Sequence, residues 1–157
     1  MENKGVSFRK YALAAALAPM LALAVPAVAS AADSSVDGQS PYANNCASGA
    51  TTIADKSSDD GSVKIEVRYS GTCGTAWARV QLKNESDVAN TTNVDIHRTQ
   101  GEPTTPQSCS VTDDKSDSLD AYTCYTGIIG TDNAQFVATA TVNGTTLTTD
   151  PVSAPAQ

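Results

Sequence analysis

VKIEVRYSGTCGTAWARVQL, residues 63–82, is the stretch that decides the fold of this 157-residue chain. Apolar and polar side chains alternate in its first half, as they do in a half-buried β-strand. The second half alternates in the same way, and Gly71 and Gly74 between the halves give the backbone the freedom for a tight reversal. A helix would scatter the β-branched residues of the first half around its surface. The stretch therefore predicts a β-hairpin with one buried face.

The first 31 residues have the pattern of a secretory signal peptide. An apolar run follows a basic start, and two small-residue cleavage patterns come after it, Ala27-Val28-Ala29 and Ala29-Ser30-Ala31. The apolar run is short for a membrane span and contains Pro19, and no second apolar stretch follows it. We therefore expect a secreted, extracellular protein with no membrane span after cleavage.

Removal of residues 1–31 leaves 126 residues, a length that suits one domain. The formal net charge of the whole chain is −7, and the removed segment carries three basic residues and one acidic residue, so the remainder carries −9. An acidic surface repels nucleic acids and anionic lipids. We therefore expect neither of them as a partner.

Four cysteines follow the expected signal peptide, and exported thiols usually pair. Three pairings can be written. We favour Cys46 with Cys73 and Cys109 with Cys124, because each pair closes a local loop. Each bond would contribute about 3–4 kcal/mol on the chain-entropy model, which would offset a core poor in large apolar side chains.

The rest of the chain predicts further short strands separated by turns and no helix. Strands are expected at residues 50–54, 94–97, 121–126 and 134–142, and polar loops at 83–93, 100–108 and 113–120. Asn143-Gly144 is the strongest short-range signal for a hairpin. The pattern predicts an all-β fold, a small disulfide-braced antiparallel β-sandwich or barrel over residues 37–152, with a flexible leader at 32–36 and a frayed tail at 153–157.

No residue pattern in the chain predicts catalysis, and no cofactor is expected. His97, the single histidine, shares a strand face with Asp95, but no nucleophile motif accompanies it, so a solvated strand face is the preferred interpretation. One histidine and four paired cysteines leave no zinc set. Residues 55–61 with Glu66 resemble a calcium loop only faintly, because the glycine is one position late. The acidic run at 113–120 is interpreted as a solvated loop, so no metal site is predicted.

Trp77 and Arg79 are the candidate binding residues. They lie on the strand face opposite Ala76 and Ala78. If that face is exposed, the pair could bind a ligand, since tryptophan and arginine are enriched at interface hot spots. The preferred alternative is that Trp77 fills the core of a two-layer fold and that Arg79 packs its stem against it.

One set of residues spans most of the expected domain: Asp37-Gly38, Pro41, Cys46, Arg68-Tyr69-Ser70, Cys73, Thr75-Ala76-Trp77-Ala78-Arg79 and Cys124-Tyr125-Thr126. Together they resemble the pattern of the DUF2690 family, a domain of unknown function common in secreted actinobacterial proteins. The chain departs from that pattern at Gly71, where family members often have proline. The resemblance implies an extracytoplasmic β-rich domain, sometimes appended to a membrane-anchored regulator, and it carries no catalytic residue over to this chain.

Two classes of function stay open at the level of sequence. The first is a non-catalytic domain that binds an extracellular protein or a cell-envelope ligand, and this is the one we predict. The second is a small secreted hydrolase that uses carboxylate chemistry, since the spacing of paired carboxylates is spatial and is not visible in a sequence. Converging carboxylates in a concave site would favour the second class.

Overall fold

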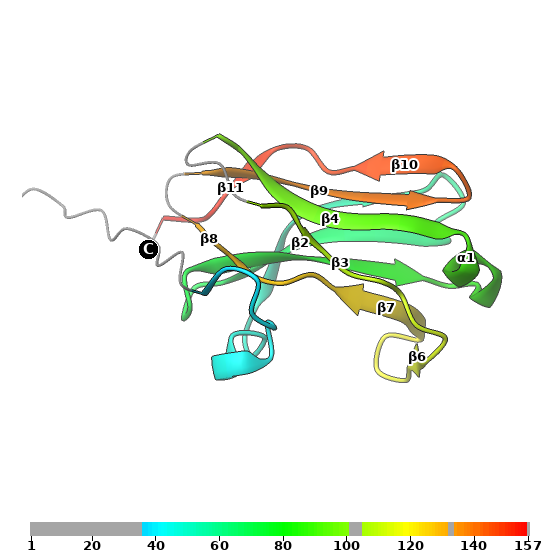
Figure 1. Ribbon diagram of the computed structural model, residues 1–157, viewed down its shortest axis with the longest axis horizontal. Helices are drawn as coiled ribbons and strands as arrows, with labels where there is room; N and C mark the ends of the chain where they lie inside the picture. The colour runs from blue at the N-terminus through cyan, green and yellow to red at the C-terminus, as the bar shows by residue number, and fades with distance from the viewer. Residues whose placement is uncertain (1–35, 101–104, 132–133, 157) are drawn as a thin grey trace, which may run out of the picture.

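Two antiparallel sheets pack face to face in the computed structural model, which describes residues 36–100, 105–131 and 134–156 (Figure 1). The prediction of an all-β, disulfide-braced fold is confirmed, and the fold is a sandwich rather than a barrel. The expected signal peptide lies outside the described residues, as does the leader at 32–36 apart from its last residue.

Sheet A contains residues 63–82, the stretch that decides the fold. Its strands run in the order β1 (Thr51–Ser57), β2 (Val63–Ser70), β3 (Thr75–Leu82), β7 (Ala121–Tyr125) and β6 (Lys115–Ser116), and β8 (Ile129–Gly130) also pairs with β3. β2 and β3 pair without interruption from Val63 opposite Leu82 to Ser70 opposite Thr75. The predicted hairpin is therefore confirmed, and it forms the centre of sheet A.

Sheet B is the second layer. Its strands run in the order β10 (Thr145–Thr148), β9 (Gln135–Val142), β4 (Thr91–Gln100) and β5 (Gln107–Ser108), and β11 (Val152–Ser153) pairs with β9. Asn143 and Gly144 connect β9 to β10 with φ angles of 52° and 76°. Both residue types tolerate this left-handed region, so the hairpin predicted from Asn-Gly is confirmed.

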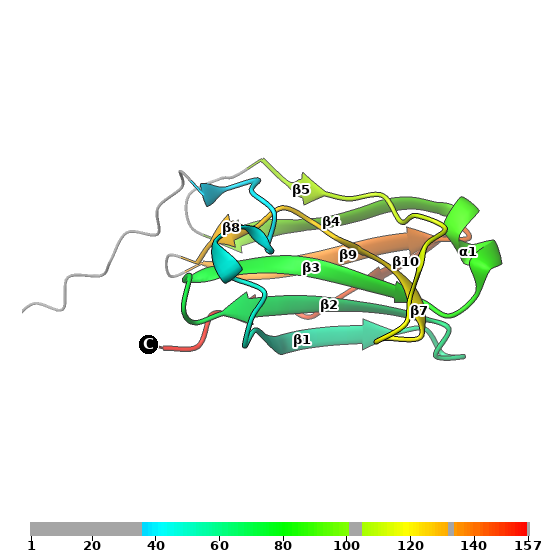
Figure 2. The ribbon, with the colours of Figure 1, turned by 90° about the horizontal axis from the view of Figure 1, so that it is seen from below.

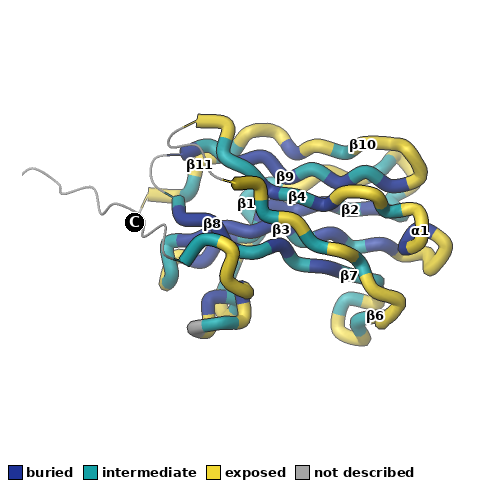
Figure 3. The backbone as a smooth tube through the Cα atoms, viewed as in Figure 1, coloured by how far each residue is buried: buried dark blue, intermediate teal, exposed yellow. Residues whose placement is uncertain are grey.

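The core lies between the two sheets, where the apolar faces of β2, β3, β4 and β9 meet (Figure 3). Its largest members are aliphatic apart from one aromatic ring, and each has no exposed surface: Ile65, Leu82, Ile96 and Phe136. Smaller residues such as Ala138 and Ala140 fill the space between them. A core of this composition is thin, as the sequence predicts.

Both disulfides have the pairing that the loop-closure argument favours. Cys46 joins Cys73, so that the segment at residues 36–50 is fastened to the turn between β2 and β3. Cys109 follows β5 of sheet B and joins Cys124 in β7 of sheet A, so that the second bond links the two layers. Cross-links of this kind stabilise a small fold by restricting the unfolded chain.

Several of the loops predicted from composition contain secondary structure. Residues 83–93 hold a one-turn helix, α1 (Glu85–Ala89), and the start of β4, because Val88 is buried against the core and the carboxylate of Asp87 accepts hydrogen bonds from Asn84 and Asn143. The short strands β5 and β6 lie in segments that we expected to be unpaired. The expected frayed tail begins one residue too early, since Ser153 pairs with Gln135 in β9.

Candidate functional site on the outer face of sheet A

The outer face of sheet A carries a run of charged and polar side chains along its central hairpin. Residues that pair across β2 and β3 share a face, and the pairs on the outer side are Lys64 with Gln81, Glu66 with Arg79, Arg68 with Trp77, and Ser70 with Thr75. Two segments project from this side of the sandwich in Figure 1: residues 36–50, which include the short helix η2 (Ala43–Asn45), and the segment around β6. The candidate site lies on this face.

Glu66 is the centre of a network of hydrogen bonds and ion pairs, although its side chain is only 3% exposed. One carboxylate oxygen, Oε2, accepts hydrogen bonds from Arg79 Nε at 2.5 Å and from Gln81 Nε2 at 3.0 Å, and the Arg79 Nη2 atom also lies 2.5 Å away. The other oxygen, Oε1, is 3.0 Å from Lys64 Nζ and accepts a longer bond from the Thr52 hydroxyl. The side chains of Glu66, Lys64, Arg79, Gln81 and Thr52 are called the Glu66 network below.

Electrostatics keep the Glu66 network ionised. Burial of Glu66 opposes its negative charge, but hydrogen bonds from Arg79 and Lys64 and their positive charges outweigh burial, so the pKa of Glu66 lies below its usual value. Burial likewise opposes the charge on Arg79, yet its bond to Glu66 raises the pKa of the guanidinium. The bond to Glu66 also raises the pKa of Lys64. The network therefore holds a fixed cation and a fixed anion side by side.

Arg68 extends the charged face towards β1. Its guanidinium donates to the Thr52 hydroxyl at 2.7 Å and to the carbonyl oxygen of Ala50 at 2.6 Å. Burial and the nearby positive charge of Arg79 lower the pKa of Arg68. Arg68 on β2 and Arg79 on β3 thus both lie near the buried carboxylate of Glu66.

Trp77 is buried, as the preferred interpretation predicts, but it is not in the core between the sheets. It faces outward beside Arg68, is 2% exposed, and lies outside the inter-sheet cluster. Figure 2 shows residues 36–50 crossing the outer side of β3, where this ring lies, and Pro41 and Cys46 of that segment are buried as well. The prediction that Trp77 is buried is therefore confirmed, but the prediction that it lies in the core between the two sheets is wrong.

Burial of Trp77 also bears on its role as a candidate binding residue. Within the described residues, the Nε1 atom of its indole has no hydrogen-bond partner, and neither has the Oγ1 atom of Thr75. The indole is covered, so in this conformation it offers no surface to a ligand. An exposed Trp77–Arg79 patch is therefore not formed, and the guanidinium of Arg79 is bound to the carboxylate of Glu66.

A pair of tyrosines flanks the Glu66 network. Tyr42 belongs to residues 36–50, which are called the covering segment below, and Tyr125 ends β7, where it lies opposite Arg79. Their ring centroids are 5.3 Å apart and the rings meet edge to face at 84°. Partial burial and the neighbouring Tyr125 hydroxyl raise the pKa of Tyr42 to about 12. Tyr42 is nevertheless 60% exposed, the one large hydrophobic side chain with that much exposure in the described part of the chain.

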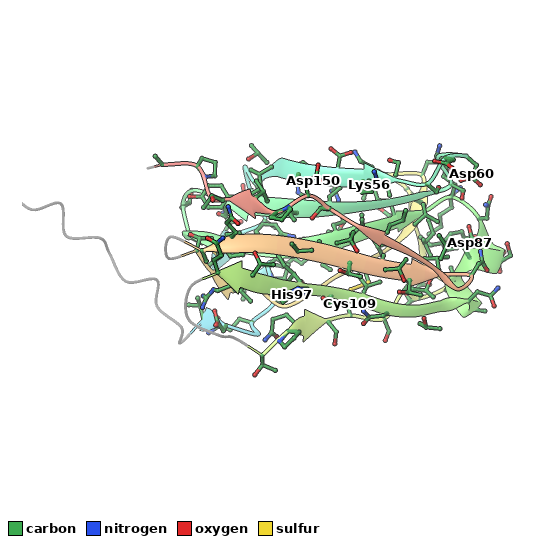
Figure 4. All side chains as sticks on the ribbon, turned by 90° about the horizontal axis from the view of Figure 1, so that it is seen from above. Lys56, Asp60, Asp87, His97, Cys109 and Asp150 are labelled. Atoms are coloured by element: carbon green, nitrogen blue, oxygen red, sulfur yellow. A yellow bond between two sulfur atoms is a disulfide. The ribbon has the colours of Figure 1, made fainter. Side chains whose placement is uncertain are left out.

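The histidine lies on the other sheet. His97 Nδ1 is 3.0 Å from Asp95 Oδ1 on the outer face of sheet B, and Asn93 donates to the second oxygen of that carboxylate at 2.5 Å (Figure 4). Among the residues that the structure describes, no hydroxyl or thiol is hydrogen-bonded to His97. The imidazole is 38% exposed, which agrees with a solvated strand face.

Two of the carboxylates that we considered for calcium are paired with cations. Glu66 is bound by Lys64 and Arg79, and Asp55 is 3.6 Å from the same lysine. In the acidic loop, Asp120 is paired with Lys115. Residues 36–100, 105–131 and 134–156 contain no cluster of three or more histidine, cysteine, aspartate or glutamate side chains able to hold a metal ion. No helix in these ranges is long and apolar enough to cross a membrane.

Sequence reasoning misses the central residue of the site. Glu66 entered the argument only as the last position of a faint calcium loop, although it is the one acidic side chain among the outward-facing residues of the central hairpin. One acidic residue among Lys64, Arg68 and Arg79 on the same predicted face of the hairpin is a pattern from which an ion-pair network could have been predicted. Tyr42 and Tyr125 are 83 residues apart, and no local pattern in the sequence could have joined them.

The geometry defines a disulfide-braced all-β sandwich domain whose outer sheet face carries a preformed charged and aromatic surface. The chain belongs to the DUF2690 family, proteins of unknown function, and the family model matches residues 34–138. The match ends within β9, so β10 and β11 lie beyond it. The family resemblance predicted from sequence is confirmed.

One relative is the uncharacterized protein YjfA of Bacillus subtilis (strain 168). It is 35% identical to this chain over 66 residues, which are 40% of this chain and 42% of that protein. The match therefore spans less than half of either protein. No solved structure has significant similarity to this chain.

Proposed function

We propose that this protein is a non-catalytic binding domain, and that the outer face of sheet A contacts an extracellular ligand, either a protein or a component of the cell envelope. The observation that carries the proposal is Tyr42, 60% exposed, next to Tyr125 and to the ionised Glu66 network. Tyrosine and arginine are enriched in interfaces relative to the rest of a protein surface. A strongly exposed tyrosine beside a fixed arginine suits recognition of a partner.

Preorganisation supports a binding role for this face. Arg79 is held by two contacts to one carboxylate oxygen, and Tyr42 by its ring contact and by the nearby Cys46–Cys73 disulfide. Side chains fixed before binding lose less conformational entropy when a ligand arrives. The same fixing is weak support for catalysis, since the lowered pKa of Glu66, the central carboxylate, does not suit proton transfer near neutral pH.

Two disulfides support a location outside the reducing cytoplasm, where such bonds persist. Together with the signal-peptide pattern of residues 1–31, they support our proposal that the protein is secreted. An extracellular location restricts the ligand to molecules of the medium or of the cell surface.

The hydrolase alternative has less support. A carboxylic acid that donates a proton at neutral pH needs a raised pKa, whereas the pKa of Glu66 is lowered by Arg79 and Lys64. The hydrogen bond between His97 and Asp95 is the one observation that favours a hydrolase, because it orients an imidazole, the usual group for acid–base catalysis. A test of function must therefore include His97.

The experiment compares two variants of the mature protein, residues 32–157, in binding to isolated cell walls and to immobilised culture-medium proteins. Tyr42→Ala is expected to weaken binding about tenfold or more, as loss of an interface hot spot does. His97→Ala, on the opposite sheet, serves as the matched control and should bind as the unchanged protein does. Turnover of peptide, ester, glycoside or phosphoester substrates that disappears with His97→Ala would overturn the proposal and favour the hydrolase.

A further inference from the structure

A groove of about 420 Å³ opens at one end of the outer side of sheet A. Its walls come from the turn between β1 and β2, the end of β3, and the projecting segment that contains β6 and leads into β7 (Figure 1). Lys64 and Gln81 line it and also belong to the Glu66 network, so the groove adjoins the surface described above. Small-molecule sites commonly have volumes of about 300–1,000 Å³.

Lysines gather in this groove. Four lysines follow residue 35, and three of them line the groove: Lys64, Lys83 and Lys115. One acidic residue, Asp120, lines it as well, so the lining carries a formal charge of +2 in a chain whose net charge is −7. Three lysines close together in an acidic protein depart from its average surface, and their attraction for an anion depends on the carboxylates beside them.

The three ammonium groups differ in how their charge is balanced. Lys64 is held by Glu66 and Asp55, and Lys115 is 2.5 Å from Asp120. The carboxylate of Asp120 is 89% exposed, so an incoming anion can displace it at little cost. Lys83 has no ion pair with any described residue. The groove therefore has one uncompensated cation and one that is easily released.

Nearby polar groups are already occupied, which leaves the lysines as the main donors. The backbone nitrogen of Gly61 donates to Ser58, and both the nitrogen and the hydroxyl of Ser62 donate to the Asp60 carboxylate. These bonds lower the pKa of Asp60 to about 2, so it stays anionic beside the groove. Attraction to the lysines and repulsion from this carboxylate both grow in proportion to the charge of the ligand, so where attraction prevails a phosphate with two charges is held more strongly than a monovalent anion.

We infer that this groove binds phosphate groups, and that the ligand is a small phosphate ester, because a groove of about 420 Å³ has room for more than a phosphate alone. Lysine binds phosphate as a point charge with three rotatable donors, whereas arginine binds phosphate and carboxylate groups through its planar fork of donors. The arginines of this face are engaged elsewhere, Arg79 by Glu66 and Arg68 by Thr52 and Ala50. This inference rests on the proposed binding function and names a ligand class for the end of the same face.

The test measures binding of glycerol 3-phosphate, inorganic phosphate and tripolyphosphate to the mature protein by calorimetry or NMR at constant ionic strength. Saturable binding is expected, with one site per chain. Lys83→Gln should weaken it roughly fivefold, the effect of one charge contact at about 4 Å in water. Lys56→Gln is the matched control, because Lys56 is exposed on β1 and does not line the groove (Figure 4).

Two results would overturn the inference. One is the absence of saturable binding of any of the three phosphates, and the other is an equal loss of affinity in Lys83→Gln and Lys56→Gln, which would indicate attraction by net charge alone. Binding of inorganic phosphate with no gain from glycerol 3-phosphate would remove the claim for an ester. If phosphate binding fails while Tyr42→Ala still weakens binding to cell walls or medium proteins, the groove inference is wrong and the proposed function stands. If phosphate binds while Tyr42→Ala leaves binding to cell walls and medium proteins unchanged, the proposed function is wrong and the groove inference stands.

Discussion

Replacement of Glu66 by glutamine tests whether the charge at the centre of the outer face stabilises the fold. Glutamine keeps the shape of the side chain but removes the anion from Arg79 and Lys64. Loss of one partner from a fully buried ion pair costs about 3–5 kcal/mol. Arg79 keeps 15% of its surface and Lys64 keeps 38%, so water partly compensates them, and we expect a cost of about 2–3 kcal/mol for Glu66→Gln.

The assay is urea denaturation at pH 7, followed by circular dichroism. Asp120→Asn is the control, because it makes the same chemical change in an exposed ion pair with Lys115 and should leave the unfolding midpoint unchanged. Addition of Arg79→Met to Glu66→Gln should recover part of the loss, since the unpaired cation is then removed as well. A midpoint for Glu66→Gln that equals that of Asp120→Asn would refute the reasoning.

The same residue gives the domain a pH dependence with a defined sign. The pKa of Glu66 in the folded protein lies below the ordinary value of 4.5, because hydrogen bonds from Arg79 and Lys64 outweigh burial. Folding therefore gains stability from this carboxylate above about pH 4.5 and loses it as the pH falls through the lower, folded value. Unfolding midpoints measured between pH 7 and pH 3 should decline less steeply in Glu66→Gln, and identical slopes would contradict this assignment.

Three further predictions concern the covering segment at residues 36–50. Trp77→Ala should cost about 3–5 kcal/mol, as loss of a buried aromatic ring does, and an unchanged melting temperature would mean that the ring is exposed. Joint replacement of Cys46 and Cys73 by serine should cost about 3.5 kcal/mol for a 27-residue separation and shift the fluorescence of the single tryptophan to longer wavelength, and an unshifted spectrum would show that the segment covers the ring without its bond. Burial and Tyr125 raise the pKa of Tyr42 to about 12, so an absorbance titration should show a step near pH 12 and stability should fall as the pH rises from 10 to 12, and a Tyr42→Phe variant that keeps this late step would refute the assignment.

Local patterns predict the strands and turns well because they depend on neighbouring residues. The alternation in residues 63–82 predicts the β2–β3 hairpin, and Asn143-Gly144 predicts the β9–β10 turn. Proximity in sequence also predicts the two disulfides, because their separations of 27 and 15 residues close the shortest loops. In each case the determining contacts lie within a short stretch of chain.

The candidate site was harder to predict, because contacts across distant segments create it. Alternation places Trp77 opposite Ala76 and Ala78, but it cannot tell that residues 36–50 fold over that face and bury the ring. Composition marks residues 83–93 as a loop, yet one buried residue, Val88, is enough to hold a helical turn against the core. The pairing of Glu66 with Arg79 depends on the register of β2 against β3. An alternating pattern does not determine that register, because a shift by two residues would keep the same side chains on the same face.

The central claim is that the outer face of sheet A is the binding surface, and hydrogen–deuterium exchange tests it most directly. Exchange is measured on the mature protein, free and bound to isolated cell walls or to a captured medium protein. The account predicts that protection on binding concentrates in residues 36–50, 63–82 and 121–125, which form the covering segment, the central hairpin and β7. Protection confined to residues 91–100 and 135–148 of sheet B, with no change in these three segments, would contradict it.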